Sequence, residues 1–154
     1  MGFYDRHRDM YAGGRPDAAA RRSNRAMSFL AARGVFGWWL VRLETINPKS
    51  RTLLSLPLVT AHVGGVHYLV SMLGTGSRWV RNVRAADGLV TVTVGWRRAI
   101  RLVEVPVALR APIIKNYLQR APGGRPHIPV DKDALLAAFE AVAADFPVFE
   151  ICRR

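Results

Sequence analysis

The 154-residue sequence has one cysteine, only eleven acidic residues and no long uncharged apolar run. Cys152 therefore has no second cysteine with which to form an internal disulfide, and one thiol cannot build a cysteine-based metal cluster. No stretch of about 18 uncharged apolar residues occurs, so we expect no helix that crosses a membrane. The first residues alternate in charge and contain no apolar core of a secretory signal. We therefore expect a cytoplasmic protein.

The sequence also lacks the common constellations of catalytic side chains. Its four histidines, His7, His62, His67 and His127, do not have the spacing of metal ligands. No order of serine, histidine and acid appears, and no glycine-rich phosphate motif of the Walker or Rossmann type occurs. If the protein is an enzyme, we expect a cofactor to supply the reactive group and the protein to supply binding and orientation.

Positive charge is abundant. The chain has 23 lysines and arginines, which gives a net charge of +12. Such a charge favours an anionic partner, which could be nucleic acid, an acidic membrane surface or a polyanionic cofactor. The arginines are spread along the chain and no aromatic–basic ribonucleoprotein motif appears, so we do not expect a nucleic-acid partner. A nucleic-acid-binding module is kept as an alternative function.

The chain length fits one hydrophobic core preceded by a basic arm. Residues 1–36 form the predicted basic helical N-terminal arm, with a helix from Pro16 to about Gly34, and residues 37–154 form the predicted main domain. Aromatic residues such as Phe29, Phe36 and Trp38 follow the arginines of the arm. This pattern would suit a peripheral contact with an anionic membrane, but it would equally suit an arm that folds back over the core. Both alternatives stay open at this stage.

The main domain is predicted to be an α+β fold, a small and mostly antiparallel barrel with flanking helices. Strands are expected at 38–45, 52–61, 66–71, 90–94, 98–105 and 148–152, and helices after Ser77, at 111–120 and at 131–144. Gly64-Gly65 marks a tight hairpin turn, and Pro57 predicts an edge position or a bulge in the second strand.

The stretch 67–84 changes from an apolar run to glycines and then to a basic segment, which predicts a strand, a tight loop and a helix. Ser77 is a plausible N-cap, and the free N–H groups of a helix start attract anions. Arg78 and Arg81 lie three residues apart, as do Trp79 and Asn82, so one short helix can present a cationic row beside an indole and an amide. The alternative is a surface helix with one packed tryptophan.

Several motifs of the chain occur in an order that resembles a known family. They are Tyr68-Leu-Val-Ser-Met-Leu-Gly74, Trp79-Val-Arg-Asn82, Arg110-Ala-Pro-Ile-Ile114, Arg125-Pro-His-Ile-Pro-Val130 and Phe146-Pro-Val-Phe149, preceded by Ser50 and Pro57. Over residues 38–151 the chain resembles the deazaflavin (coenzyme F420)-dependent nitroreductases, which belong to the split β-barrel flavoproteins and occur chiefly in actinobacteria. The resemblance implies a split β-barrel and an F420H2-dependent reductase of the nitroreductase or quinone reductase type.

The resemblance also implies where the coenzyme would bind. The family's basic loop Gly-x-x-Ser-Gly, which meets the phosphate and polyglutamate tail of the 8-hydroxy-5-deazaflavin coenzyme, falls on Asn47-Pro-Lys-Ser-Arg51, with both glycines replaced. Ser71 and Met72 fall where the family's strand end lines the ring. The residues expected to bind the coenzyme are Lys49, Ser50, Arg51, Pro57, Ser71, Met72, Ser77, Arg78, Trp79 and Asn82.

No side chain of the protein is expected to react, because the reduced coenzyme would pass its hydride directly to a quinone, a nitroaromatic or an activated alkene. Tyr117 and His127 are the candidate substrate contacts, with a helix-packing residue and a proline-locked loop as their respective alternatives. The partner is expected to be this small-molecule hydride acceptor, and the protein a monomer or homodimer. FMN is the second cofactor candidate, in a split-barrel relative without deazaflavin activity.

Overall fold

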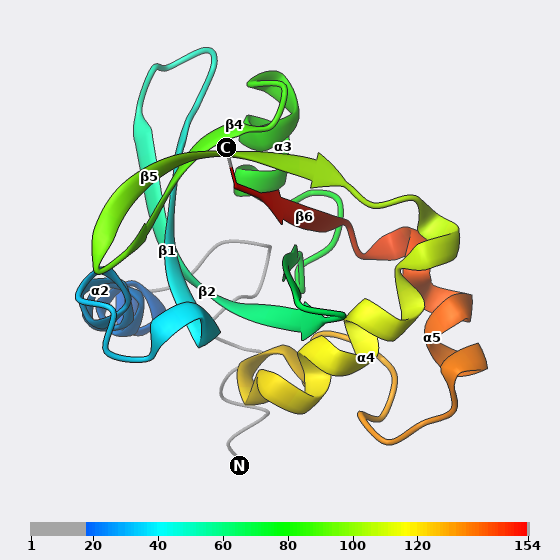
Figure 1. Cartoon of the computed structure of the whole chain (residues 1–154). Coiled ribbons are helices and arrows are strands. Elements are labelled where there is room, and N and C mark those ends of the chain that lie inside the picture. Colours follow the sequence, from blue (N-terminus) through cyan, green and yellow to red (C-terminus); the bar gives the residue numbers. More distant parts are fainter. Residues whose placement is uncertain (1–17, 154) are drawn as a thin grey trace.

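Six antiparallel strands close into a barrel in the order β1-β2-β3-β6-β5-β4 (Figure 1). This computed structural model describes residues 18–153. The strands are β1 Leu40–Ile46, β2 Leu53–Val63, β3 Val66–Val70, β4 Leu89–Val94, β5 Trp96–Glu104 and β6 Val148–Cys152. The predicted antiparallel barrel is confirmed.

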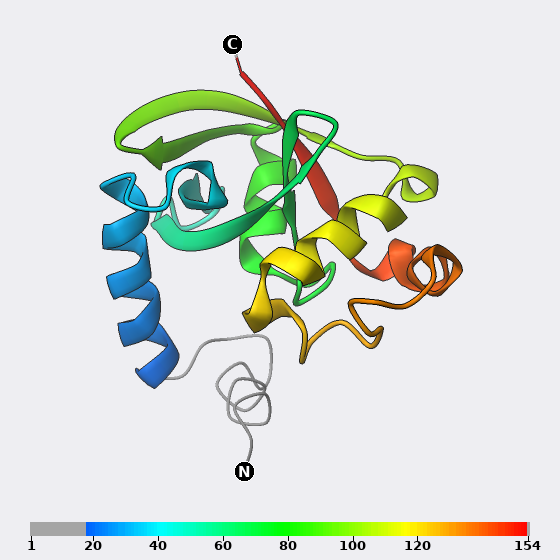
Figure 2. The same cartoon turned by 60° about the horizontal axis from the view of Figure 1, so that its bottom comes forward.

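Helices flank the barrel on separate sides (Figure 2). They are α2 Ala18–Ala32, α3 Arg78–Ala85, α4 Ala111–Arg120 and α5 Leu136–Val142, joined by short 3₁₀ turns at 37–39, 107–109, 122–124 and 143–145. Helix α2 lies alone on one side, whereas α4 and α5 lie together on the other. Helix α4 has the predicted bounds of 111–120.

Strand β2 changes its partner part of the way along. Its first seven residues, Leu53–Val59, pair with β1, and its last four, Thr60–Val63, pair with β3 across the Gly64-Gly65 hairpin. The edge of Leu53–Val59 that faces away from β1 therefore carries no neighbouring strand. Pro57 lies in this part of β2, opposite Arg42 of β1, where a missing backbone donor is tolerated. The predicted edge position of Pro57 is confirmed.

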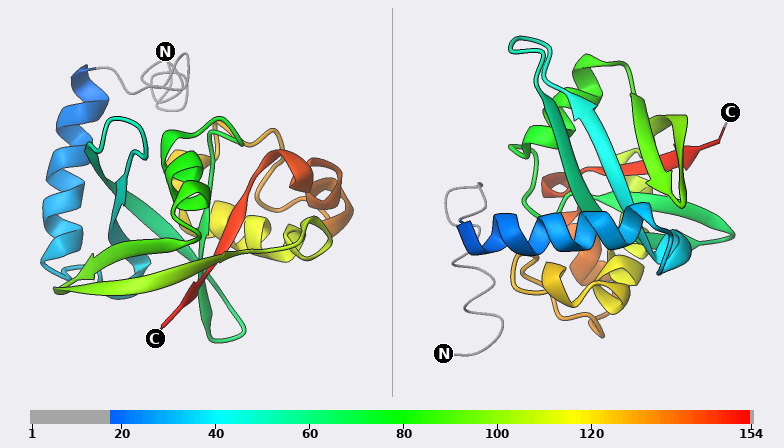
Figure 3. Two further views of the ribbon diagram at one scale, coloured as in Figure 1. Left: turned by 90° about the horizontal axis from the view of Figure 1, so that it is seen from above. Right: turned by 90° about the vertical axis from the view of Figure 1, so that its left-hand side faces the viewer.

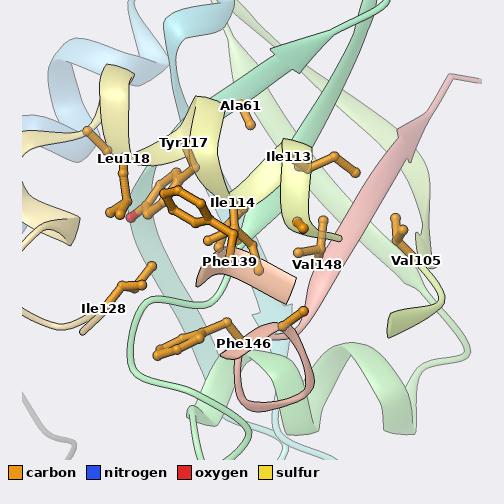
Figure 4. Close-up of a cluster of buried hydrophobic side chains, with 14 residues drawn as sticks. Ala61, Val105, Ile113, Ile114, Tyr117, Leu118, Ile128, Phe139, Phe146 and Val148 are labelled. Atoms are coloured by element: carbon orange, nitrogen blue, oxygen red, sulfur yellow. The ribbon is translucent and has the colours of Figure 1, made fainter. Parts of the chain in front are cut away.

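Two hydrophobic cores hold the fold together. The first fills the barrel, and α3 contributes Trp79, Val80 and Val83 to it. The second lies outside the barrel, where α4 and α5 pack against β2, β3 and β6 (Figure 4). Its members include Ile114, Leu118 and Phe139, which are fully buried. The site described below meets this second core at Val70 and Met72.

Several predicted boundaries were wrong by two residues or more, and two of them have a clear local cause. The helix expected at 131–144 begins only at Leu136, because Asp131 forms a turn in which its carboxylate accepts from the N–H of Asp133 at 2.8 Å and its carbonyl accepts from Ala134. Trp38 and Trp39, expected in the first strand, form a 3₁₀ turn that follows Gly37, whose φ is +55°. The indole of Trp39 donates to the carbonyl of Arg120, which ties this turn to α4.

The described part of the N-terminal arm packs on the barrel. Helix α2 crosses β1 and β2 (Figure 3). Phe29 stays more than half exposed, and Phe36 is exposed as well. Residues 18–32 thus pack on the barrel, as in the alternative in which the arm folds back, but the expected burial of the arm's aromatic residues fails at Phe29 and Phe36. Residues 1–17 lie outside the described part of the chain. None of the helices within 18–153 is long and apolar enough to cross a membrane, and a peripheral membrane contact stays a prediction.

Gly88 is the position where the fold depends most on a missing side chain. Its φ is +79°, and a Cβ placed there would lie 2.2 Å from the carbonyl oxygen of Leu102. Gly95 has a similar φ of +75° but open space around it. We expect Gly88→Ala to lower the free energy of unfolding by at least about 3 kcal/mol, and Gly95→Ala by about 1–2 kcal/mol from the left-handed backbone alone. Urea denaturation measures both, and equal losses would contradict the assigned packing of Gly88.

Candidate functional site

The unpaired edge of β2 borders a cavity of about 560 Å³. Helix α2, strands β1 and β2, the end of β3, the loop after β3 and the start of α3 form its walls. The lining residues are Arg21, Asn24, Arg25, Ser28, Phe29, Arg42, Leu54, Ser55, Leu56, Pro57, Leu58, Val70, Met72, Leu73, Ser77, Arg78 and Trp79. We call this the apolar cavity, because most of its exposed lining is carbon.

Trp79 forms the inner end of this cavity. Its indole is 5% exposed and packs against Phe149 of β6, with ring centroids 5.5 Å apart. This contact fixes the ring, since both residues belong to the core of the barrel. A rigid indole beside Met72 and Leu58 offers a flat apolar surface of the kind that aromatic ligands pack against.

Ser71 shapes the loop that leads from β3 to α3. Its N–H donates to the carbonyl of Pro147 at 2.9 Å, and its hydroxyl donates to the carbonyl of Gly74 at 2.7 Å. Gly74 itself has a φ of +84°. Ser71 is buried and does not line the cavity, but the loop that it holds places Met72 and Leu73 in the wall.

A second cavity, of about 520 Å³, adjoins the first. Its lining residues are Asn47, Pro48, Lys49, Arg78, Arg81 and Asn82. We call this the cationic cavity. Arg78 lines both cavities, so the two lie next to each other at the start of α3. No aspartate or glutamate is among the described residues that line either of them, so the pair of cavities favours an anionic ligand.

Asn47 organises the turn that brings Lys49 to the cationic cavity. Its side-chain oxygen accepts from the N–H groups of Lys49 at 2.9 Å and Ser50 at 3.1 Å, and its carbonyl accepts from the N–H of Arg51. Arg51 has a φ of +60°, the left-handed conformation that suits the glycine of the family pattern. The Ser50 hydroxyl hydrogen-bonds to that of Thr52. Ser50 and Arg51 are not among the described lining residues.

Asn82 joins α3 to β1. Its amide donates to the hydroxyl of Thr45 at 3.0 Å, and both side chains are buried. Ser77 occupies the expected N-cap position of α3, but its hydroxyl makes no capping hydrogen bond. Ser77 is buried, and it lines the apolar cavity together with Arg78 and Trp79 of the first turn of α3.

The two candidate substrate contacts lie elsewhere in the structure. Tyr117 is 5% exposed in the core between α4 and the barrel, and Gly124 leaves the space that its ring fills (Figure 4). His127 lies in the loop between α4 and α5. Neither residue is among the described lining of the two cavities, and a role of either in substrate binding stays a prediction.

The amino-acid sequence alone did not indicate the wall that α2 contributes to the cavity, or the place of Arg42 in it. Arg21, Asn24, Arg25, Ser28 and Phe29 follow the i, i+3, i+4, i+7, i+8 spacing of one helix face. That spacing could have shown that they share a face, but only the packing of α2 on β1 and β2 shows that the face borders the cavity. Within residues 18–153, no group of histidine, cysteine or acidic side chains could hold a metal ion.

No protein-family model matches the chain, and no curated protein is similar to it in sequence. Solved structures are similar in fold. An F420-H2 dependent reductase (FDR-A) is 22% identical, with 73% of this chain and 93% of that chain covered and a TM-score of 0.50. A conserved hypothetical protein of Mycobacterium tuberculosis, Rv2991, is 19% identical, with 80% and 78% covered and a TM-score of 0.51.

A third structure, a putative pyridoxamine 5'-phosphate oxidase from Listeria innocua, is 12% identical, with 77% of this chain and 86% of that chain covered and a TM-score of 0.50. The structural neighbours thus include F420-H2 dependent reductases and proteins like the pyridoxamine phosphate oxidases. Together with the closed six-stranded barrel, they define the fold of this chain as the split β-barrel of the FMN-binding type.

Proposed function

We propose that the chain is an oxidoreductase that binds the reduced deazaflavin coenzyme F420 and passes a hydride to a quinone, a nitroaromatic or an activated alkene. The observation that carries this proposal is that an apolar cavity and a cationic cavity lie next to each other, with Arg78 lining both. The coenzyme has the matching construction, with a flat ring system at one end and a phosphate and polyglutamate tail at the other.

The apolar cavity suits the ring system for two reasons. Trp79, Met72 and the leucines of β2 offer flat apolar contact. The unpaired edge of Leu53–Val59 also offers backbone N–H and C=O groups, which need partners and can hydrogen-bond the polar edge of a heterocycle. An edge strand thus binds a planar ring by the same groups that would otherwise bind another strand.

The cationic cavity favours F420 over FMN. Lys49, Arg78 and Arg81 gather around it with no acidic residue among its described lining. FMN carries one phosphate, whereas the polyglutamate tail carries several further charges, so three cations match the longer polyanion better. FMN remains the second candidate, since neighbours with this fold include a putative pyridoxamine 5'-phosphate oxidase.

The bound coenzyme would supply the hydride, and the residues of this chain would bind and orient it. Trp79 and the loop held by Ser71 fix one face of the cavity, and helix α2 covers the other and limits the access of water. The similarity in fold to an F420-H2 dependent reductase supports this assignment. The hydride acceptor would enter the same apolar cavity.

The direct test is a titration of the purified protein with coenzyme F420 and with FMN, followed by intrinsic tryptophan fluorescence. We expect the deazaflavin to bind more tightly and to quench Trp79, and we expect its affinity to fall as salt is added. Tighter binding of FMN would contradict the proposal.

Variants of the cationic cavity test the position of the tail. Lys49→Gln and Arg81→Gln should each weaken F420 binding about tenfold and reduce its salt dependence, because each removes a charge-assisted contact. Arg51→Gly is the matched control, since it removes a cation of the same turn that does not line the cavity and relieves a left-handed backbone. An equal loss of affinity in Arg51→Gly would place the tail outside the cationic cavity.

A further inference from the structure

The face that α2 turns toward the apolar cavity is polar. Arg21, Asn24, Arg25 and Ser28 line the cavity together with Phe29. Two arginines on this face suggest that the ligand of the cavity carries a negative charge on the α2 side.

Arg42 adds a third guanidinium from β1. Its Nε atom is buried and has no hydrogen-bond partner among the described residues. Its terminal nitrogen lies 3.9 Å from Glu44, whose carboxylate also binds Arg97 at the shorter distance of 3.2 Å. A buried donor without a partner is costly. Since Nε itself has no accessible surface, a ligand of the cavity would meet Arg42 through other atoms of its guanidinium, which Glu44 holds only at 3.9 Å.

Arg25 is the second group that carries the argument. It lines the apolar cavity, and no ion pair of the described residues involves it. Among the described residues, Glu44 is paired with both Arg42 and Arg97. The described lining on the α2 side of the cavity contains arginines and no carboxylate.

These arginines lie away from the cationic cavity. Arg42 lies opposite Pro57 of β2. The turn that carries Lys49 joins β2 at Leu53, four residues before Pro57. Four residues of a strand span about 13 Å. Arg25 and Arg42 line only the apolar cavity, whereas Lys49 and Arg81 line only the cationic one. Two sets of cations thus line different cavities, and Arg78 is common to both cavities.

We propose that the apolar cavity takes a second ligand with a flat apolar body and a carboxylate end, and that Arg25 and Arg42 bind the carboxylate. We identify this ligand with the hydride acceptor, which rests on the proposed function. The acceptor would then be an unsaturated acid whose double bond is conjugated to the carboxylate. The binding of the acid itself requires no coenzyme.

Calorimetric titration of the coenzyme-free protein with cinnamate and with cinnamamide tests the proposal, because the two probes share a shape and differ in charge. We expect cinnamate to bind about tenfold more tightly than the amide. Arg25→Gln and Arg42→Gln should each abolish this preference. Arg22→Gln, which removes a charge from α2 without touching the cavity lining, should keep it.

Equal affinities of the two probes, no binding of cinnamate, or a preference that survives in both variants would overturn the proposal. Thermal denaturation shows whether the Arg42→Gln variant folds. If that variant does not fold, the Arg25→Gln variant decides the question, because Arg25 is at an exposed position of α2. Failure of the F420 titration would remove the proposed function but leave this result standing, since no coenzyme is present.

Discussion

The structure depends on one constraint, which is that β2 is longer than the strand that can pair with it on its β3 side. Eleven residues of β2 face a β3 of five residues, and the first seven of them find a partner only in β1. An unpaired strand edge must be covered or must bind something, because its backbone groups need hydrogen-bond partners. Here α2 and the loop before α3 border that edge without covering it, and they leave a cavity beside it.

The charges of the chain become intelligible from that arrangement. Part of the net charge of +12 comes from cations at the turn after β1 and along α2. The described lining of the two cavities contains no aspartate or glutamate. Elsewhere arginines are tied into the fold. Arg110 is buried and donates hydrogen bonds to the carbonyls of Val105 and Ala143. The carboxylate of Glu104 forms ion pairs with both Arg110 and Arg84. The Arg84 guanidinium holds the pKa of the Glu104 carboxyl below its usual range.

The sequence was informative where local chemistry decides the structure. The Gly64-Gly65 hairpin, the edge position of Pro57 and the helix at 111–120 were all predicted from residue type and spacing. The start of α5 was not, because an aspartate side chain competed for the backbone of residues 131–134 in a segment whose composition favours helix.

The site was predictable only in part. Trp79 and Asn82 share a helix face by spacing, and the family resemblance adds Lys49, Met72 and Arg78, all of which line a cavity. The wall made by α2 was not predictable, because no local pattern shows which strands a helix will cross. The same reason applies to Tyr117, whose helix packs its ring into the outer core.

The central claim is that the unpaired edge of β2 is the place where the coenzyme ring binds. Hydrogen exchange of the backbone amides, with and without coenzyme F420, tests it most directly, because unpaired edge amides exchange readily until a ligand covers them. We predict new protection at those amides of residues 53–58 that point away from β1, and at residues 71–82, with none at 96–104 of β5 or in α4. Protection that spares residues 53–58 and appears on the face of α4 and α5 would contradict the account.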